Sequence, residues 1–118
     1  MNHVYFKQKR VPMFTFVETT HFNKILYDYL SDKEYQRLQI ELIKNPRKGD
    51  VIPGSGGFRK IRYSARGKGK SGGVRIIYYL VSAKGKIYLF DIYSKGERED
   101  LTKDEINMLK KLVEKGIK

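Results

Sequence analysis

The stretch GFRKIRYSARGKGKSGGVRIIYY, residues 57–79, decides the fold that we predict from the sequence. Two runs rich in β-branched and aromatic residues, 58–63 and 74–81, flank a loop of glycine and basic residues. Because side chains alternate along a strand, Lys60 and Arg62 share one face of the sheet. The sequence therefore predicts cations held rigidly on a sheet, beside a basic loop.

Charge is distributed unevenly over the chain. The 118 residues carry a formal net charge of +12, and 40% of them are hydrophobic, which fits one folded domain. Residues 51–90 contain nine Lys or Arg and no Asp or Glu, so the positive charge is concentrated in the predicted sheet. Such a surface favours an anionic partner, with nucleic acid first and an anionic membrane second.

The composition supports few other kinds of chemistry. The absence of cysteine excludes disulfides, thiolate catalysis and cysteine zinc sites, and it is compatible with a reducing cytoplasm. The only histidines, His3 and His21, belong to different predicted elements, which argues against a metal site or a Ser-His-Asp arrangement. No apolar run reaches the ~18 residues that a membrane span needs. We therefore expect a cytoplasmic protein without a metal or another cofactor.

Hydrophobic periodicity predicts an α+β fold with the element order β-α-α-β-β-β-α. A strand over residues 14–18 precedes an αα-hairpin, whose second helix opens with a capping box between Ser31 and Glu34. The two strands of the opening stretch and a strand over residues 86–93 complete a mostly antiparallel four-stranded sheet, before a C-terminal helix that begins at Thr102. Strict alternation gives the last strand two faces: Ile87, Leu89 and Asp91 on one, and Tyr88, Phe90 and Ile92 on the other.

The first residues are expected to lie outside the domain. Residues 1–12 contain no apolar segment of the kind found in a signal peptide. We interpret them as a flexible N-terminal extension, with Met13 as a candidate original start. Residues 13–118 then form a single domain.

The glycine loop contains a motif that suggests nucleotide binding. Residues 67–72 match G-x-G-x-x-G, but a dinucleotide site needs a helix next, and residues 74–81 indicate a strand. A P-loop needs a glycine where Ser64 stands, and the motifs that accompany a kinase Gly-rich loop are absent. The acids of residues 97–105 are better explained by the positive end of the last helix than by a metal site.

Clustered cations on a sheet can do more than bind a polyanion. RNA is cut without a metal when its own 2′-OH attacks the adjacent phosphorus, if the protein transfers the protons and balances the charge of the phosphorane. Cations supply that balance and activate a neighbouring lysine, and an aromatic such as Tyr93 can stack a splayed base. From these residues alone, phosphate binding without reaction remains an open alternative.

Four segments together resemble the HigB-type branch of the RelE toxin superfamily. These are GGFRKIR at 56–62, GKGKSGGVRIIYY at 67–79, IYSKGE at 92–97 and LTKDE at 101–105. The resemblance extends from about Phe14 to the final helix. It implies a bacterial type II toxin that cleaves messenger RNA, usually in the ribosomal A site. It also implies a cognate antitoxin encoded beside it, commonly a helix-turn-helix protein of the HigA type.

By matching positions, the resemblance implies a metal-free basic site on the concave sheet. The predicted catalytic residues are Lys60, Arg62, Arg75 and Lys95. The predicted RNA-binding residues are Arg66, Lys68, Lys70, Tyr93 and Arg98.

The resemblance also implies roles within this set. Arg62 and Arg75 would stabilise the phosphate, and Lys60 is the candidate for proton transfer. The sequence departs from the family where Gly96 replaces an arginine. Thr102 likewise lies near the position of a family tyrosine. Arg98 and Tyr93 are the candidate substitutes for the missing arginine and tyrosine.

Two other functions fit the same fold or charge. One is a non-enzymatic relative resembling the ParE branch, which poisons DNA gyrase. The other is a basic nucleic-acid-binding module without catalysis, which would bind with a steep salt dependence.

Overall fold

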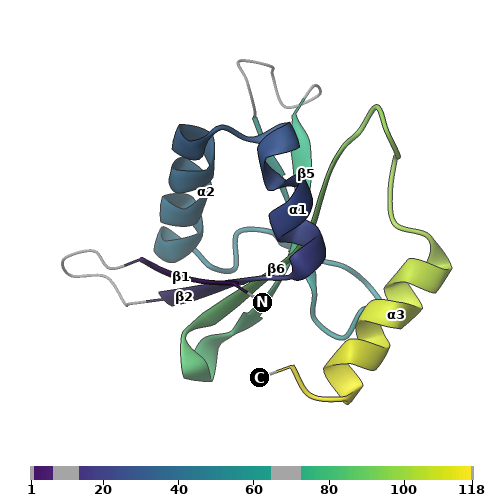
Figure 1. The fold of residues 1–118 in the computed structure, drawn as a ribbon. Helices are drawn as coiled ribbons and strands as arrows, with labels where there is room; N and C mark the ends of the chain where they lie inside the picture. Colours follow the sequence, from purple (N-terminus) through teal and green to yellow (C-terminus); the bar gives the residue numbers. More distant parts are fainter. Residues whose placement is uncertain (1, 7–13, 65–72, 118) are drawn as a thin grey trace.

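The computed structural model describes residues 2–6, 14–64 and 73–117, which form one sheet with helices on both faces (Figure 1). In chain order the elements are β1 (Asn2–Phe6), β2 (Phe14–Glu18), α1 (Thr20–Tyr29), α2 (Asp32–Lys44), β3 (Asp50–Val51), β4 (Arg59–Tyr63), β5 (Val74–Val81), the short 3-10 helix η2 (Ser82–Lys84), β6 (Lys86–Ser94) and α3 (Lys103–Glu114).

The sheet has six strands in the order β1-β2-β6-β5-β4-β3. The four predicted strands are all present and an α+β fold is confirmed, but the predicted four-stranded sheet is wrong in size, because it lacked β1 and β3. The sheet is mostly antiparallel as predicted, with one parallel pair, β2 with β6. Parallel pairing requires a long connection, which α1, α2 and the intervening strands provide. β1 lies within the predicted extension of residues 1–12, and β3 is two residues long, too short to show a period.

Helix starts follow the predicted capping chemistry. The Ser31 side chain accepts a hydrogen bond from the backbone N–H of Glu34, whose carboxylate accepts from the backbone N–H of Ser31, so the predicted capping box is confirmed. Thr102 and Glu105 form the same arrangement at the start of α3. These two boxes set where α2 and α3 begin.

The face of the sheet under α1 and α2 is mainly apolar, and the carboxylate that it buries, Glu18 of β2, accepts hydrogen bonds from Tyr35 and Asn23. Side chains of both helices pack on β2, β4, β5 and β6, with Phe16, Leu38 and Ile76 completely buried. Ile61 belongs to this cluster, as the alternation along β4 predicts. Large apolar groups packed without solvent contact give the hydrophobic stabilisation that holds the domain together.

The opposite face packs on α3 and contains a β-bulge. Ile77 pairs with Asp91 and Tyr78 pairs with Leu89, so Phe90 is an extra residue in β6. Phe90 and Asp91 therefore both lie on the α3 face, where the Phe90 ring contacts the Phe58 ring edge-on. The predicted alternation placed Asp91 with Leu89 and is wrong, because one extra residue reverses the face of everything beyond it.

Among the described residues, no helix is long and apolar enough to cross a membrane.

Candidate functional site

The predicted cations lie on the α3 face of the sheet, in a register that brings three of the site residues into one row. Arg62 of β4 is directly opposite Arg75 of β5, and Arg75 is directly opposite Tyr93 of β6. Directly opposed residues share a face, and like charges in that position repel each other. The Arg62–Arg75–Tyr93 row is therefore an arrangement that an anion would stabilise.

Burial differs along this row. Arg62 is exposed, and no ion pair joins it to another described residue. Arg75 is 4% exposed and Tyr93 is 3% exposed. A charged guanidinium is costly to bury without a partner, so Arg75 is the side chain of the row whose placement most needs a functional explanation.

Three unpartnered polar atoms gather around Arg75 and Tyr93. Nη1 of Arg75, Oη of Tyr93 and Nε of Arg98 are buried, and none has a hydrogen-bond partner among the described residues. Buried polar atoms are nearly always paired, and all three of these groups can donate a hydrogen bond. The cluster therefore lacks an acceptor, such as an oxygen atom of an anion.

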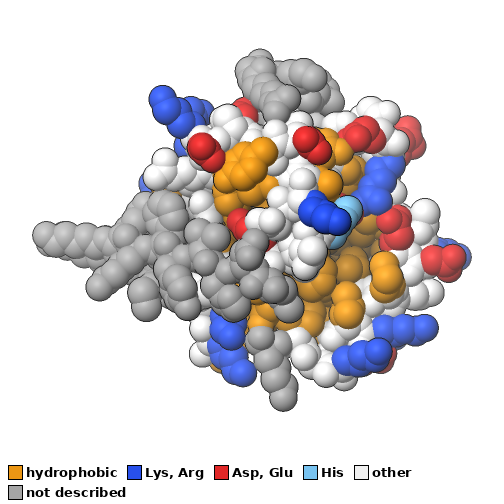
Figure 2. Space-filling view, in the orientation of Figure 1, with side chains coloured by type: hydrophobic (Ala, Val, Ile, Leu, Met, Phe, Trp, Pro, Cys, Tyr) orange, Lys and Arg blue, Asp and Glu red, His pale blue; other side chains and the backbone are white. Residues whose placement is uncertain are grey.

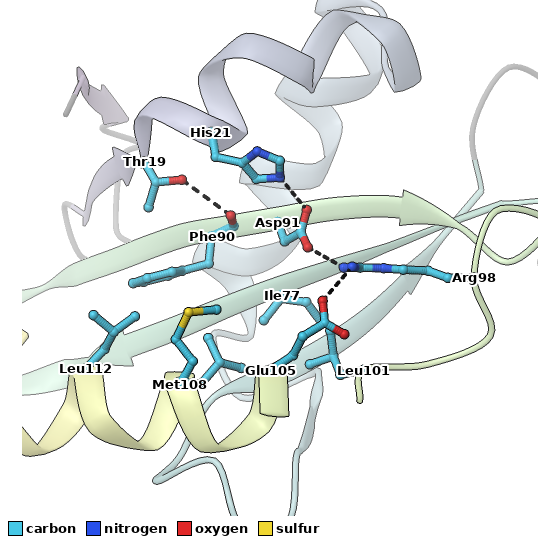
Figure 3. A pocket seen from close by; sticks show the side chains of 11 residues that line it. Thr19, His21, Ile77, Phe90, Asp91, Arg98, Leu101, Glu105, Met108 and Leu112 are labelled. Carbon is cyan, nitrogen blue, oxygen red and sulfur yellow. Dashed lines mark hydrogen bonds and ion pairs between the residues drawn. The ribbon is translucent and has the colours of Figure 1, made fainter. Parts of the chain in front are cut away.

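Arg98 covers Tyr93 and is held by two carboxylates. Its guanidinium lies 4.2 Å from the centroid of the Tyr93 ring. The same group donates to Glu105 at 2.8 Å and also pairs with Asp91 (Figure 3). Burial disfavours the charge of Arg98, but Asp91 and Glu105 outweigh it and raise the pKa of the guanidinium. Arg98 is thus a permanent cation that two acids already neutralise.

The environment of Tyr93 favours its protonated form. Burial raises the pKa of the phenol, as does the charge of Asp100, while Arg98 and Arg75 lower it without reversing the shift. Its hydroxyl therefore carries a proton at neutral pH. The ring is enclosed and covered by Arg98, so in this arrangement it presents no face on which a base could stack.

Lys60 lies next to the row and is bound to an acid. Its Nζ is 3.1 Å from Oδ1 of Asp100, whose side chain is 66% exposed. A hydrogen bond from the backbone N–H of Leu101, followed by the contact with Lys60, lowers the pKa of Asp100. Lys60, Arg62 and Asp100 also line a pocket of 530 Å³ between the β3–β4 edge and the start of α3.

The remaining predicted residues lie elsewhere. Lys95 is exposed in the turn directly after β6, at the sheet end where β4 stops and β5 begins. Arg66, Lys68 and Lys70 lie outside the described residues. The structure thus brings Lys60, Arg62, Arg75, Tyr93 and Arg98 to one face of the sheet.

A second cavity of 410 Å³ lies between α1, β6 and α3. At one end His21 Nε2 is 3.0 Å from Asp91, which also binds Arg98, and Ile77, Met108 and Leu112 line the apolar remainder (Figure 3). Figure 2 shows apolar side chains gathered between α1 and α3, with charged side chains around them.

Sequence reasoning missed the acids that hold the cations: Asp91, Asp100 and Glu105. The capping pattern identified Glu105 as a backbone partner only, and no local pattern pairs Asp91 or Asp100 with a distant cation. Among the described residues, no group of three or more His, Cys, Asp or Glu is placed to hold a metal ion.

No known family model matches this sequence. A solved structure of the E. coli toxin RelE, a double arginine-to-alanine mutant in the free state, superimposes with a TM-score of 0.53. The match has 15% sequence identity and covers 86% of this chain and 96% of that chain. At this identity the likeness concerns the fold, so the protein has a RelE-like α+β fold.

Proposed function

We propose that this protein is an endoribonuclease toxin of the RelE superfamily, HigB-type branch, which cleaves messenger RNA on the ribosome. The RelE-like fold, the sequence segments that resemble HigB-type toxins and the basic α3 face all support the proposal. The observation that carries it is the cluster of unpartnered donors on Arg75, Tyr93 and Arg98, because this cluster lacks an anionic acceptor.

The proposed reaction needs no group beyond the RNA and the side chains. The 2′-oxygen of one nucleotide loses its proton and attacks the adjacent phosphorus, and the bond from phosphorus to the 5′-oxygen breaks. A proton is delivered to that 5′-oxygen, which leaves a 2′,3′-cyclic phosphate and a 5′-OH end. Arg75 and Arg62 stabilise the charge that develops on the phosphoryl oxygens.

Proton transfer falls to the other site residues. Lys60 is our candidate for it, and Tyr93 is a second group with a proton to donate, because its pKa is raised. Lys95, with Arg66, Lys68 and Lys70, would position the RNA backbone.

The proposed partners follow from this function. The substrate is messenger RNA on the ribosome, so the protein acts in the cytoplasm. A cognate antitoxin, a HigA-type helix-turn-helix protein encoded beside it, would neutralise it. The adjacent reading frame is the quickest check of that part of the proposal.

The test is induction of the protein in bacteria at matched expression levels, with growth and transcript ends recorded. We expect growth arrest and new transcript ends with the native chain, and neither with Arg62→Ala or Arg75→Ala. Lys84→Ala is the matched control, because Lys84 is an exposed cation in η2, which precedes β6, whereas the site lies toward the end of that strand. Toxicity retained by both arginine variants would contradict the proposal.

The two alternatives give different results in the same experiment. A gyrase poison arrests growth and breaks DNA but leaves messages intact. A simple nucleic-acid-binding module neither arrests growth nor cuts RNA.

A further inference from the structure

The chain between β6 and α3, residues 95–101, which we call the strap, is attached to the body of the domain by polar contacts. Glu97 accepts hydrogen bonds from the Tyr29 hydroxyl and from Ser94. Further along the strap, Arg98 binds Asp91 and Glu105. The last attachment joins Asp100 to Lys60.

These attachments involve groups that the proposed function assigns to RNA. Lys60 and Arg98 both face a carboxylate of this same chain instead of a phosphate. Tyr93 lies beneath Arg98, and Arg75, directly opposite Tyr93, is 4% exposed. A phosphodiester cannot reach Nη1 of Arg75 or Oη of Tyr93 while these side chains remain enclosed.

The ion pair of Asp100 with Lys60 is the attachment that an RNA phosphate can replace most easily. Its side chain is 66% exposed, whereas that of Lys60 is 27% exposed. An ion pair this open to water is weak and is screened by salt. An RNA phosphate presents Lys60 with the same charge and acceptor atoms as the carboxylate does.

Asp100 also connects this exchange to the backbone of the strap. Its Oδ1 accepts the Leu101 N–H at 2.8 Å as well as the Lys60 ammonium. Leu101 packs in the apolar cluster under α3, so the end of the strap is fixed there. Release of Lys60 would therefore remove one attachment of the strap, while Leu101 stays fixed and Arg98 stays bound to Asp91 and Glu105.

We infer that the strap is an electrostatic latch over the cation site, in which Asp100 competes with RNA phosphate for Lys60. This inference rests on the proposed function, because it takes the Arg62–Arg75–Tyr93 row as the RNA site. In the free protein Asp100 holds Lys60, and an RNA phosphate that binds Lys60 displaces Asp100 and loosens this end of the strap.

The test measures binding of a fluorescent single-stranded RNA whose 2′-O-methyl groups prevent cleavage, by anisotropy at fixed salt. Asp100→Asn removes the competing charge but keeps an acceptor for the Leu101 N–H. Glu99→Gln is the matched control, since Glu99 is exposed on the same strap and forms no ion pair with a described residue. Both substitutions are also made in a Lys60→Met background.

The latch predicts that Asp100→Asn binds this RNA about two- to fivefold more tightly than the native chain, the range expected for an exposed ion pair. Glu99→Gln should give a smaller gain, and the advantage of Asp100→Asn over it should vanish with Lys60→Met. Equal gains from Asp100→Asn and Glu99→Gln would overturn the inference. So would a gain that persists without Lys60, or a loss of affinity.

Hydrogen exchange of the RNA complex measures the loosening of the strap directly. The peptide that covers residues 95–101 should exchange faster with RNA than without it, and unchanged or slower exchange would contradict the latch.

The binding measurement also separates this inference from the proposed function. Binding that depends on Asp100 and Lys60 in a protein that cuts no message supports the latch and rejects the nuclease. Cleavage without an effect specific to Asp100 rejects the latch alone, and no RNA binding by any variant rejects both.

Discussion

The two faces of the sheet differ in what they bury. Under α1 and α2 the buried residues are mostly apolar and aromatic side chains drawn from both helices and four strands, and the two polar ones, Glu18 and Gln39, include a carboxylate that accepts hydrogen bonds from Tyr35 and Asn23. Under α3 the buried residues include Arg75 and the hydroxyl of Tyr93, with Arg98 and its two carboxylates beside them. The face under α1 and α2 stabilises the domain, whereas the face under α3 holds buried polar and charged groups that lower its stability.

The free-energy cost of the unpartnered donors on the α3 face can be estimated. A buried donor without a partner costs about 1–3 kcal/mol, and the cluster contains three such atoms. A domain of this size is stable by about 5–15 kcal/mol, so the apolar face must compensate for much of what the charged face costs. Substitutions should therefore separate the two faces, one affecting folding and the other affecting RNA.

The largest effect is expected from truncation in the apolar face. Leu38 of α2 is 0% exposed, and Leu38→Ala should lower the free energy of unfolding by about 2–5 kcal/mol, because it leaves a cavity. Leu112→Ala is the control, since Leu112 of α3 is 37% exposed and should cost far less. Urea denaturation measures both, and equal losses would contradict the division between the faces.

Replacement of the buried Arg75 should affect RNA cleavage strongly and stability little. Arg75→Met should reduce cleavage of messenger RNA about 10²–10³-fold, the loss typical for one donor to a developing oxyanion. Its free energy of unfolding should stay the same or rise, because the change removes a buried charge whose Nη1 has no partner among the described residues and relieves repulsion from Arg62. A loss of more than about 2 kcal/mol in stability would show that Arg75 serves the fold.

The two capping boxes give a smaller and matched comparison. Ser31→Ala and Thr102→Ala should each lower stability by about 1 kcal/mol, because each removes an N-cap acceptor. Only Thr102→Ala should also change the affinity for RNA, since the Thr102 hydroxyl accepts a hydrogen bond from the backbone N–H of Glu105, whose carboxylate binds Arg98. An equal change in RNA affinity from Ser31→Ala would weaken the distinction between the faces.

The smallest effect is expected when the pH is lowered. A hydrogen bond from the Tyr29 hydroxyl lowers the pKa of Glu97. Hydrogen bonds from the backbone N–H groups of Leu101 and Thr102 lower the pKa values of Asp100 and Glu105, and nearby cations add to these shifts. A depressed folded pKa gives stability that is complete above the ordinary values, 4.5 for Glu and 3.8 for Asp, and is lost as pH falls below them. Hydrogen exchange should therefore show the strap loosening in acid before the α1–α2 face does. Simultaneous loosening of both would count against this order.

Local patterns predicted much of the fold. The period along α2 and α3, their capping boxes and the alternation in β4 needed only neighbouring residues, and all are confirmed. The parallel pairing of β2 with β6 and the bulge at Phe90 depend on tertiary packing, which no local period encodes.

The candidate site shows the same limit. Alternation places Lys60 and Arg62 on one face, but the row with Arg75 and Tyr93 depends on the register between strands. The ion pair of Lys60 with Asp100 joins residues 40 positions apart, so sequence proximity gives no sign of it. The sequence thus predicted which side chains carry charge, while their burial and their internal partners follow from the folded chain.

The central claim is that the unpartnered hydrogen-bond donors around Arg75 bind an RNA phosphate. Cleavage of RNA by the purified protein tests this claim most directly. A defined message on purified ribosomes is incubated with the native chain or with Arg75→Met, and the ends are mapped by primer extension. We predict cuts that leave a 5′-OH and a cyclic phosphate with the native chain, and intact message with Arg75→Met. Equal cleavage by both proteins, or none by the native chain, would contradict the account.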